Sequence, residues 1–191
     1  MSNQPLNEVI LTQASQLFRE QGYSATTIKQ IAKAAGCTNA ALYYYYAGGK
    51  EQILHEVIQH SVAADPVELT AVPHATSLTQ YLTLLSLKLK ETMPQLTDRV
   101  NWIMIQFPNL PPEQKQFIQN QHLRFHHALH LQIKRFVPDE NQADQLAWLV
   151  FCAFFGYQQL FIKMNLAPQA SITDETYVQF LIDTVTTAHG S

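Results

Sequence analysis

Apolar side chains recur at helical spacing along almost the whole chain, and this periodicity restricts the fold more than any other feature. A clear case near the N-terminus has the spacing i, i+4, i+7, i+8 of one helix face: Ile10, Ala14, Leu17 and Phe18. No run of residues has the alternating pattern, bounded by turn signals, that a half-buried strand shows. With 191 residues, 47% of them hydrophobic, the chain is long and apolar enough to bury a sizeable core. The sequence therefore predicts an all-α protein.

Glycine and proline divide the predicted helices into a three-helix head, residues 1–49, and a larger helical body, residues 50–191. In the head, the first helix ends at Gly22, a second stops at Gly36, and a third begins at Thr38 and runs through Tyr46. The body is expected to hold a loop-like segment over 63–77 and helices over about 50–62, 78–92, 96–107, 113–136, 142–164 and 174–188.

The second and third helices have the proportions of a helix-turn-helix, in which the second helix of the pair enters the major groove of DNA. Thr27 and Gln30 form a capping-box pattern before the first helix of the pair, and Thr38 is an N-cap candidate before the other. Short helix pairs joined by a glycine-containing turn are common, so this pattern alone is weak evidence for DNA binding.

A longer run around this pair carries a specific resemblance. Its characteristic positions are Gly22-Tyr23, Thr27, Ile31-Ala32, Ala35-Gly36, Leu42-Tyr43, Tyr46 and Lys50-Glu51. With this spacing, the first 55 or so residues resemble the DNA-binding domain of the tetracycline-repressor (TetR) family. Cys37 and Thr38 stand where that family usually has Val and Ser, Tyr46 replaces Phe, and the linker before Lys50 is one residue longer than the commonest one. The resemblance implies a homodimeric regulator of transcription that responds to a small molecule.

Ten residues of this region are candidates for contact with DNA. Asn39, Ala40 and Ala41 begin the third helix, where Asn can read adenine and Ala methyls can touch the thymine methyl. The N-cap residues and the lysines can contact the phosphate backbone of DNA, and Tyr43 resembles the family's phosphate-binding tyrosine. The full predicted set is Thr27, Lys29, Thr38, Asn39, Ala40, Ala41, Tyr43, Tyr44, Tyr45 and Lys50.

The charge distribution permits this assignment but does not establish it. The net charge is −3, yet residues 1–50 hold four basic and two acidic groups. A small cationic head on an acidic body is compatible with a DNA-binding end of the molecule.

The stretch 146–161 is apolar on nearly every face, so its helix needs cover on two sides. A membrane span over 146–164 is disfavoured because Gln158, Gln159 and Lys163 interrupt it. We expect this helix and the last one to form a four-helix bundle with a second copy, as the family resemblance also implies; a monomer with a thick core is the alternative. The predicted interface residues are Trp148, Phe151, Phe155, Tyr177, Leu181 and Thr184.

Aromatic and polar residues on the middle helices form a candidate site for a small, largely apolar effector. These residues are Trp102, Phe107, Phe117, His122, Phe125, Tyr157 and Gln158. The alternative is that each of the aromatic residues belongs to an ordinary core. His122, His126 and His130 have the i, i+4 spacing of metal ligands, but no Cys or Glu completes the cluster, so we predict no metal and no cofactor.

A competing function is a helical small-molecule-binding protein or enzyme whose head binds another protein. No Ser/His/Asp order, paired-carboxylate motif or glycine-rich phosphate loop supports catalysis. Two cysteines fit a reducing compartment, and the N-terminus has no secretory pattern, so we expect a cytoplasmic protein without a membrane partner. Its expected partner is a double-stranded DNA operator.

Overall fold

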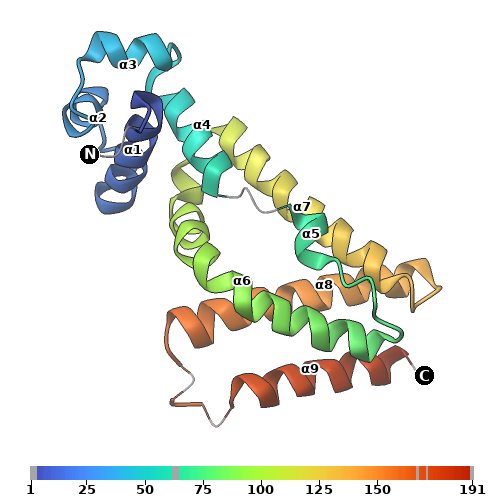
Figure 1. The fold of residues 1–191 in the computed structure, drawn as a ribbon. Coiled ribbons are helices and arrows are strands. Elements are labelled where there is room, and N and C mark those ends of the chain that lie inside the picture. Colours follow the sequence, from blue (N-terminus) through green and yellow to red (C-terminus); the bar gives the residue numbers. More distant parts are fainter. Residues whose placement is uncertain (1–3, 62–64, 167, 171, 190–191) are drawn as a thin grey trace. The chain divides into compact units, whose positions relative to one another are not determined.

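The computed structural model describes the backbone of residues 4–61, 65–166, 168–170 and 172–189, and all regular structure within these ranges is helical (Figure 1). Side chains are described for the same residues except 93–100, 162, 163, 174, 188 and 189. The all-α prediction is therefore confirmed.

The first three helices are α1 (Leu6–Gln21), α2 (Ile28–Ala34) and α3 (Asn39–Tyr45). The capping box before α2 is confirmed: Gln30 N–H donates to the Thr27 hydroxyl over 3.3 Å, and Thr27 N–H donates to Gln30 Oε1 over 2.8 Å. The Thr38 hydroxyl accepts from Ala41 N–H over 3.1 Å at the start of α3. These caps satisfy backbone amides that each helix otherwise leaves without a partner.

The described part of the chain continues through five longer α-helices, the short α-helix α5, a 3-10 helix and a π-helix. They are α4 (Gly49–Ser61), α5 (Pro66–Thr70), α6 (Leu78–Gln106), the 3-10 helix η1 (Phe107–Asn109), α7 (Pro112–Ile133), α8 (Glu140–Tyr157), the π-helix η2 (Gln158–Lys163) and α9 (Asp174–His189).

Three sequence-based boundaries are corrected. The expected loop over 63–77 contains α5, which begins at Pro66 and is capped by Asp65, whose carboxylate accepts from Val67 N–H. The helices expected over 78–92 and 96–107 are one helix, α6, which runs through Pro94. A proline within a helix removes one hydrogen bond and costs about 3 kcal/mol. Side chains of α6 are buried both before and after the proline, as at Leu89 and Trp102. The predicted helix over 142–164 changes to π geometry at Gln158.

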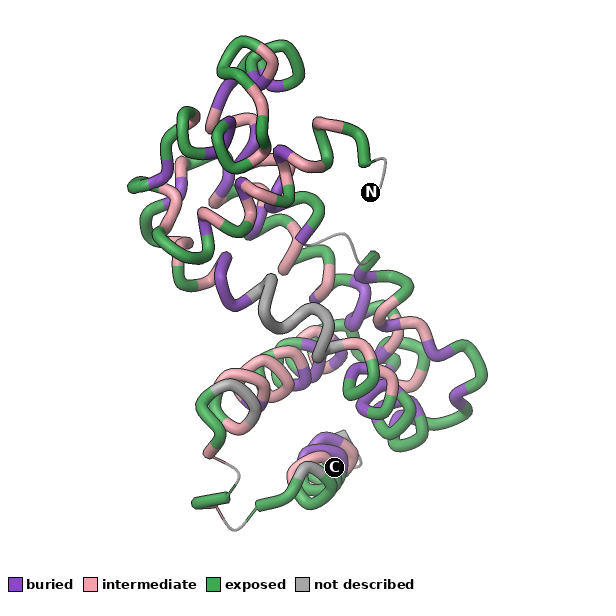
Figure 2. Tube along the Cα trace, turned by 60° about the vertical axis from the view of Figure 1, so that its left-hand side comes forward, coloured by how far each residue is buried: buried purple, intermediate pink, exposed green. Residues whose placement is uncertain are grey.

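The chain forms two compact units, each built from two segments. The head unit consists of Met1–Ala63 and Asp98–Ile118, and the body unit consists of Ala64–Thr97 and Gln119–Ser191. Each unit has its own core of buried side chains. The backbone of buried residues is purple in Figure 2. The functional division at residues 49 and 50 stays a prediction, because compactness does not say which residues bind DNA.

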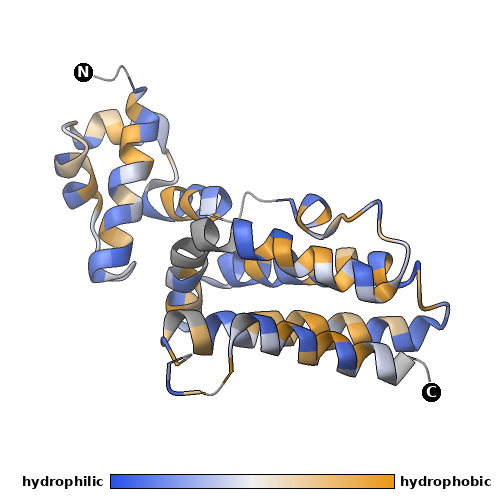
Figure 3. Cartoon of the chain, turned by 60° about the horizontal axis from the view of Figure 1, so that its bottom comes forward, coloured by the Kyte–Doolittle hydropathy of each residue, from blue (hydrophilic) through white to orange (hydrophobic). Residues whose placement is uncertain are grey.

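The core of the head unit joins the three short helices to α4 and to the ends of α6 and α7. Its fully buried side chains include Ile10, Phe18, Ile31, Leu42 and Ile53. The core of the body unit joins α6, α7, α8 and α9. Hydrophobic and hydrophilic residues are interspersed along α9, drawn in orange and blue in Figure 3. No helix among the described residues is long and apolar enough to cross a membrane.

Candidate DNA-binding surface

Helix α3 presents three consecutive tyrosines outward. The exposed fractions of Tyr43, Tyr44 and Tyr45 are 49%, 83% and 43%. The rings of Tyr44 and Tyr45 meet edge to face with 5.2 Å between their centroids. Leu42 and Tyr46 are buried, as the sequence indicates. One side of α3 therefore anchors the helix, and the other is a polar aromatic surface.

Tyr46 fixes the end of α3 to the beginning of the chain. Its hydroxyl donates to the Asn7 carbonyl over 3.0 Å, and its ring lies in the core of the head unit. Burial, together with the negative charge of Glu56, raises the pKa of Tyr46 to about 12. The neutral phenol is therefore the form that the folded head favours.

The ring of Tyr43 lies close to the backbone of Gly49. Gly49 has a φ of 64°, and a Cβ built on it would lie 3.3 Å from Cε1 of the Tyr43 ring. Glycine meets both demands because it adopts the left-handed region and leaves room for the ring. Gly49 thus lies against the tyrosine that is predicted to bind phosphate.

The remaining predicted DNA contacts lie around the same helices. Thr27 and Lys29 are exposed at the start of α2. Thr38, Asn39 and Ala40 are exposed at the start of α3, whereas Ala41 is half-buried. This arrangement puts short polar and methyl-bearing side chains beside the tyrosines, which is the mixture that base edges and phosphates require.

Lys50 differs from these residues because its ammonium group is bound within the head unit. Nζ donates to the carbonyl oxygens of Tyr23 and Thr26, each over 2.9 Å, and lies 4.2 Å from the centre of the Tyr23 ring. Burial lowers the pKa of Lys50. Its predicted contact with phosphate stays a prediction.

The predicted effector residues are divided between the two units. In the head unit, Trp102 is buried and stacks on Phe18, and Phe117 meets the ring of His55 edge to face. Phe107 is half-buried and packs against the same core. A pocket common to the whole predicted set stays a prediction.

In the body unit, His122 belongs to an aromatic cluster rather than standing alone. Its ring centroid lies 6.1 Å from that of Phe151 and 6.5 Å from that of Phe155, and Phe125 lies 5.3 Å from Phe151. Tyr157 is separate from this cluster: it stacks on Phe161 and on Tyr177, and Gln158 begins η2. Residues predicted to bind the effector thus pack, within one chain, against residues predicted to form the dimer interface.

The predicted dimer residues have unequal exposure. Trp148 is 39% exposed and Thr184 is exposed, whereas Leu181 is only 7% exposed and belongs to the core of its own body unit. Sequence reasoning did not select Phe180, which is 70% exposed on α9, or Leu149, which is 42% exposed on α8. Phe180 is one helical turn before Thr184, so the two residues lie on the same face of α9.

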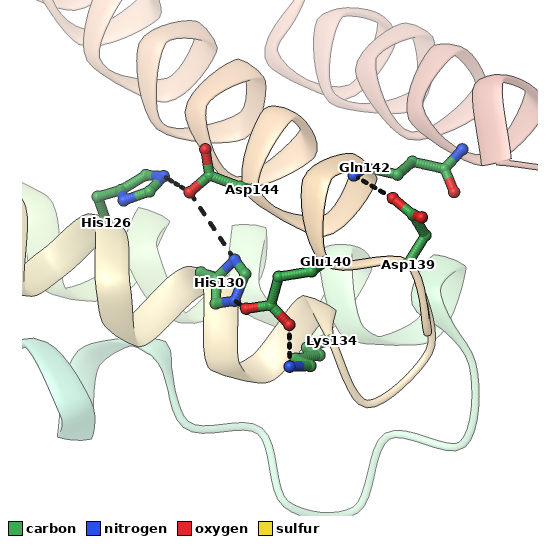
Figure 4. A network of polar contacts seen from close by, with 7 residues as sticks. All are labelled: His126, His130, Lys134, Asp139, Glu140, Gln142 and Asp144. Carbon is green, nitrogen blue, oxygen red and sulfur yellow. Dashed lines mark hydrogen bonds and ion pairs between the residues drawn. The ribbon is translucent and has the colours of Figure 1, made fainter.

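Two of the histidines connect α7 to α8 (Figure 4). His130 Nε2 lies 3.0 Å from Glu140 Oε1, and His126 Nε2 lies 3.5 Å from Asp144 Oδ1. The hydrogen bond from Lys134, followed by its charge and the neighbouring His130, lowers the pKa of Glu140. Among the described residues, no group of three His, Cys, Asp or Glu side chains is arranged to hold a metal ion.

Residues 10–57 match the model of the family described as bacterial regulatory proteins, tetR family. The chain is 43% identical over 58 residues to the HTH-type transcriptional regulator LmrA of Bacillus subtilis (strain 168), an alignment that covers 30% of this chain and 31% of LmrA. It is also 39% identical over 74 residues to the uncharacterized HTH-type regulator YxaF of that organism, covering 32% of this chain and 39% of YxaF. The chain thus spans about a third of the length of these curated relatives.

The fold is similar over nearly the whole chain. Salmonella enterica GusR superposes with a TM-score of 0.70 at 18% identity, with 100% of this chain and 98% of GusR covered. At such identity the likeness shows the fold alone. Residues 10–57 thus carry a sequence match to the tetR family of bacterial regulatory proteins, and the whole chain has the fold of GusR.

Proposed function

We propose that this chain is a DNA-binding transcriptional regulator that acts as a homodimer. The observation that carries the proposal is α3: a capped helix, anchored in the core by Leu42 and Tyr46, that presents Tyr44 at 83% exposure inside a family-matched segment. Two copies of α3 bind successive major grooves of a pseudo-palindrome whose half-sites lie one helical turn apart, roughly 34 Å.

Within this proposal the exposed side chains have two roles. Asn39, Ala40, Ala41 and Tyr44 contact base edges and set the sequence preference. Contacts to phosphate position the protein without reading sequence, and we assign them to Thr27, Lys29, Thr38, Tyr43 and Tyr45.

The dimer is proposed to form through α8 and α9. Trp148, Leu149 and Phe180 leave apolar surface exposed on these helices, and such surface is stabilised when another apolar face covers it. Two helices from each copy then form a four-helix bundle.

A small apolar molecule is proposed to regulate DNA binding, with repression as the resting state. The fold of this chain resembles that of SmeT in its complex with triclosan, with a TM-score of 0.61 at 17% identity over 97% of this chain and 91% of SmeT. That complex supports the choice of ligand class. The aromatic cluster around His122 supplies apolar surface with one polar group. The ligand regulates only if it binds the two conformational states with different affinities.

Selection of bound duplexes from a random pool tests the proposal. We expect a two-fold symmetric consensus, and a binding constant that falls steeply with salt as counterions are released. Recovered duplexes that share no consensus, or a binding constant that does not change with salt, would contradict the proposed function.

A further inference from the structure

Lys50 makes three contacts with the segment that joins α1 to α2. Two of the three ammonium N–H groups are used by the carbonyls of Tyr23 and Thr26, and the charge lies over the Tyr23 ring. Hydrogen bonds from a charged donor are roughly twice as strong as neutral ones, and a cation over an aromatic ring adds a further attraction. The first turn of α4 is thus tied to a segment more than twenty residues earlier in the chain.

The same segment is closed by a second set of bonds. The buried Thr26 hydroxyl donates to the Gly22 carbonyl over 2.8 Å and accepts from Gln21 Nε2 over 3.1 Å. Thr26 is followed at once by Thr27, the N-cap of α2. The Thr26 carbonyl therefore directly precedes the N-cap of α2, and Lys50 donates a hydrogen bond to that carbonyl.

This arrangement leaves little of the ammonium group for DNA. Lys50 is half-buried, so its charge is partly removed from solvent in the free protein, and this burial lowers its pKa. A phosphate contact would have to compete with two carbonyls that are already 2.9 Å away. Lys29, in contrast, is exposed.

We propose that Lys50 is a positioning residue for DNA binding: it holds the α1–α2 segment against the start of α4 and so sets the N-terminus of α2, without itself neutralising a phosphate. This inference rests on the proposed DNA-binding function. It differs from the sequence-based expectation for Lys50, and the two make different predictions for salt dependence.

The test compares Lys50→Met, Lys50→Arg and Lys29→Met with the wild type on one selected duplex at several salt concentrations. Met keeps the aliphatic stem of Lys50 over Tyr23 but donates no hydrogen bond, whereas Arg keeps the charge and the donors. We expect Lys50→Met to lower affinity roughly tenfold with an unchanged slope of log K against log salt, and Lys50→Arg to restore most of the loss. Lys29→Met should reduce the magnitude of the slope by about 0.9, the contribution of one phosphate.

A reduction of about 0.9 for Lys50→Met as well would overturn the inference and leave the regulator function standing. If selection with the wild-type protein recovers no bound duplex, that result would instead overturn the proposed function.

Two measurements on free protein test the internal anchoring of Lys50 without DNA, and they apply also if Lys50→Met does not fold. In the wild type, nuclear magnetic resonance should show a Lys50 ammonium signal protected from exchange with water, unlike that of Lys29. In Lys50→Arg, hydrogen exchange of the amides of residues 23–28 should match the wild type. A Lys50 signal that exchanges as fast as the Lys29 signal would refute the internal anchoring.

Discussion

The indole N–H of Trp102 donates a 2.8 Å hydrogen bond to the Phe18 carbonyl, and the two rings stack nearly parallel with 6.1 Å between centroids. The N–H of Gly22 donates to the same carbonyl over 3.1 Å. The last turn of α1 and the end of α6 are thus joined at one backbone atom. The segment that Lys50 holds begins at this junction.

Two replacements of Trp102 should distinguish how much its hydrogen bond and its ring each contribute to the free energy of unfolding. Trp102→Phe keeps an aromatic ring but leaves the Phe18 carbonyl with one donor fewer, and we expect a loss of about 1–3 kcal/mol in the free energy of unfolding. Trp102→Ala should lose about 3–5 kcal/mol. Denaturant titration measures both, with Ile105→Ala, which is 61% exposed on the same helix, as the control. A Phe variant as stable as the wild type would show that the bond contributes nothing net.

Asn39→Ala should alter sequence preference. Because a side chain that pairs with one base contributes discrimination only at that base, we expect the preference at one operator position to relax by roughly 1–3 kcal/mol. Tyr43→Phe is the matched control, since loss of a phosphate contact weakens binding to all duplexes alike. Binding to a set of single-base operator variants distinguishes the two effects, and equal losses on all variants for Asn39→Ala would remove it from the base-reading set.

Phe180→Glu should yield a folded monomer. The side chain is 70% exposed in the single chain, so a charge there does not disturb the protomer, but burying that charge in a dimer interface costs several kcal/mol unless it is paired. Sedimentation at micromolar concentration measures the change. Leu131→Glu, at a position 50% exposed on α7, serves as the control and should remain dimeric. A dimeric Phe180→Glu protein would locate the interface elsewhere.

Alkaline pH should destabilise the head through Tyr46. Burial raises the pKa of Tyr46 from 10.0 to about 12, so the folded state holds a proton that the unfolded state releases first. The stabilisation is complete below about pH 10 and is lost as the pH rises toward about 12. Denaturant midpoints between about pH 8 and 11.5 should fall less in Tyr46→Phe than in the wild type. Parallel curves for the two proteins would show that the phenol does not carry this dependence.

The sequence predicts the N-terminal helices well because local chemistry decides them. Thr27 and Gln30 form the capping box that their spacing indicates, and Thr38 caps α3. The outward tyrosines follow from geometry, since consecutive residues on a helix cannot all face the core. These features need no knowledge of distant parts of the chain.

Features that depend on distant segments were not predictable in this way. Pro94 signals a helix end, but packing on both sides of it keeps α6 continuous. Nothing local shows that Lys50 binds the carbonyls of Tyr23 and Thr26, because both bonds join residues far apart in the sequence. The placement of Trp102 in the core of the head unit is likewise a product of tertiary packing.

The core of the head unit has a consequence for building hybrids of the proposed regulator. Trp102, Leu110 and Ile118 belong to the same buried cluster as Phe18 and Leu42. A fusion that transplants only residues 1–49 onto a foreign sensor would cut through this cluster and leave apolar side chains of α1 without their cover. Exchange of specificity between such proteins should therefore graft the exposed residues of α3 onto an intact recipient, rather than join fragments at the linker.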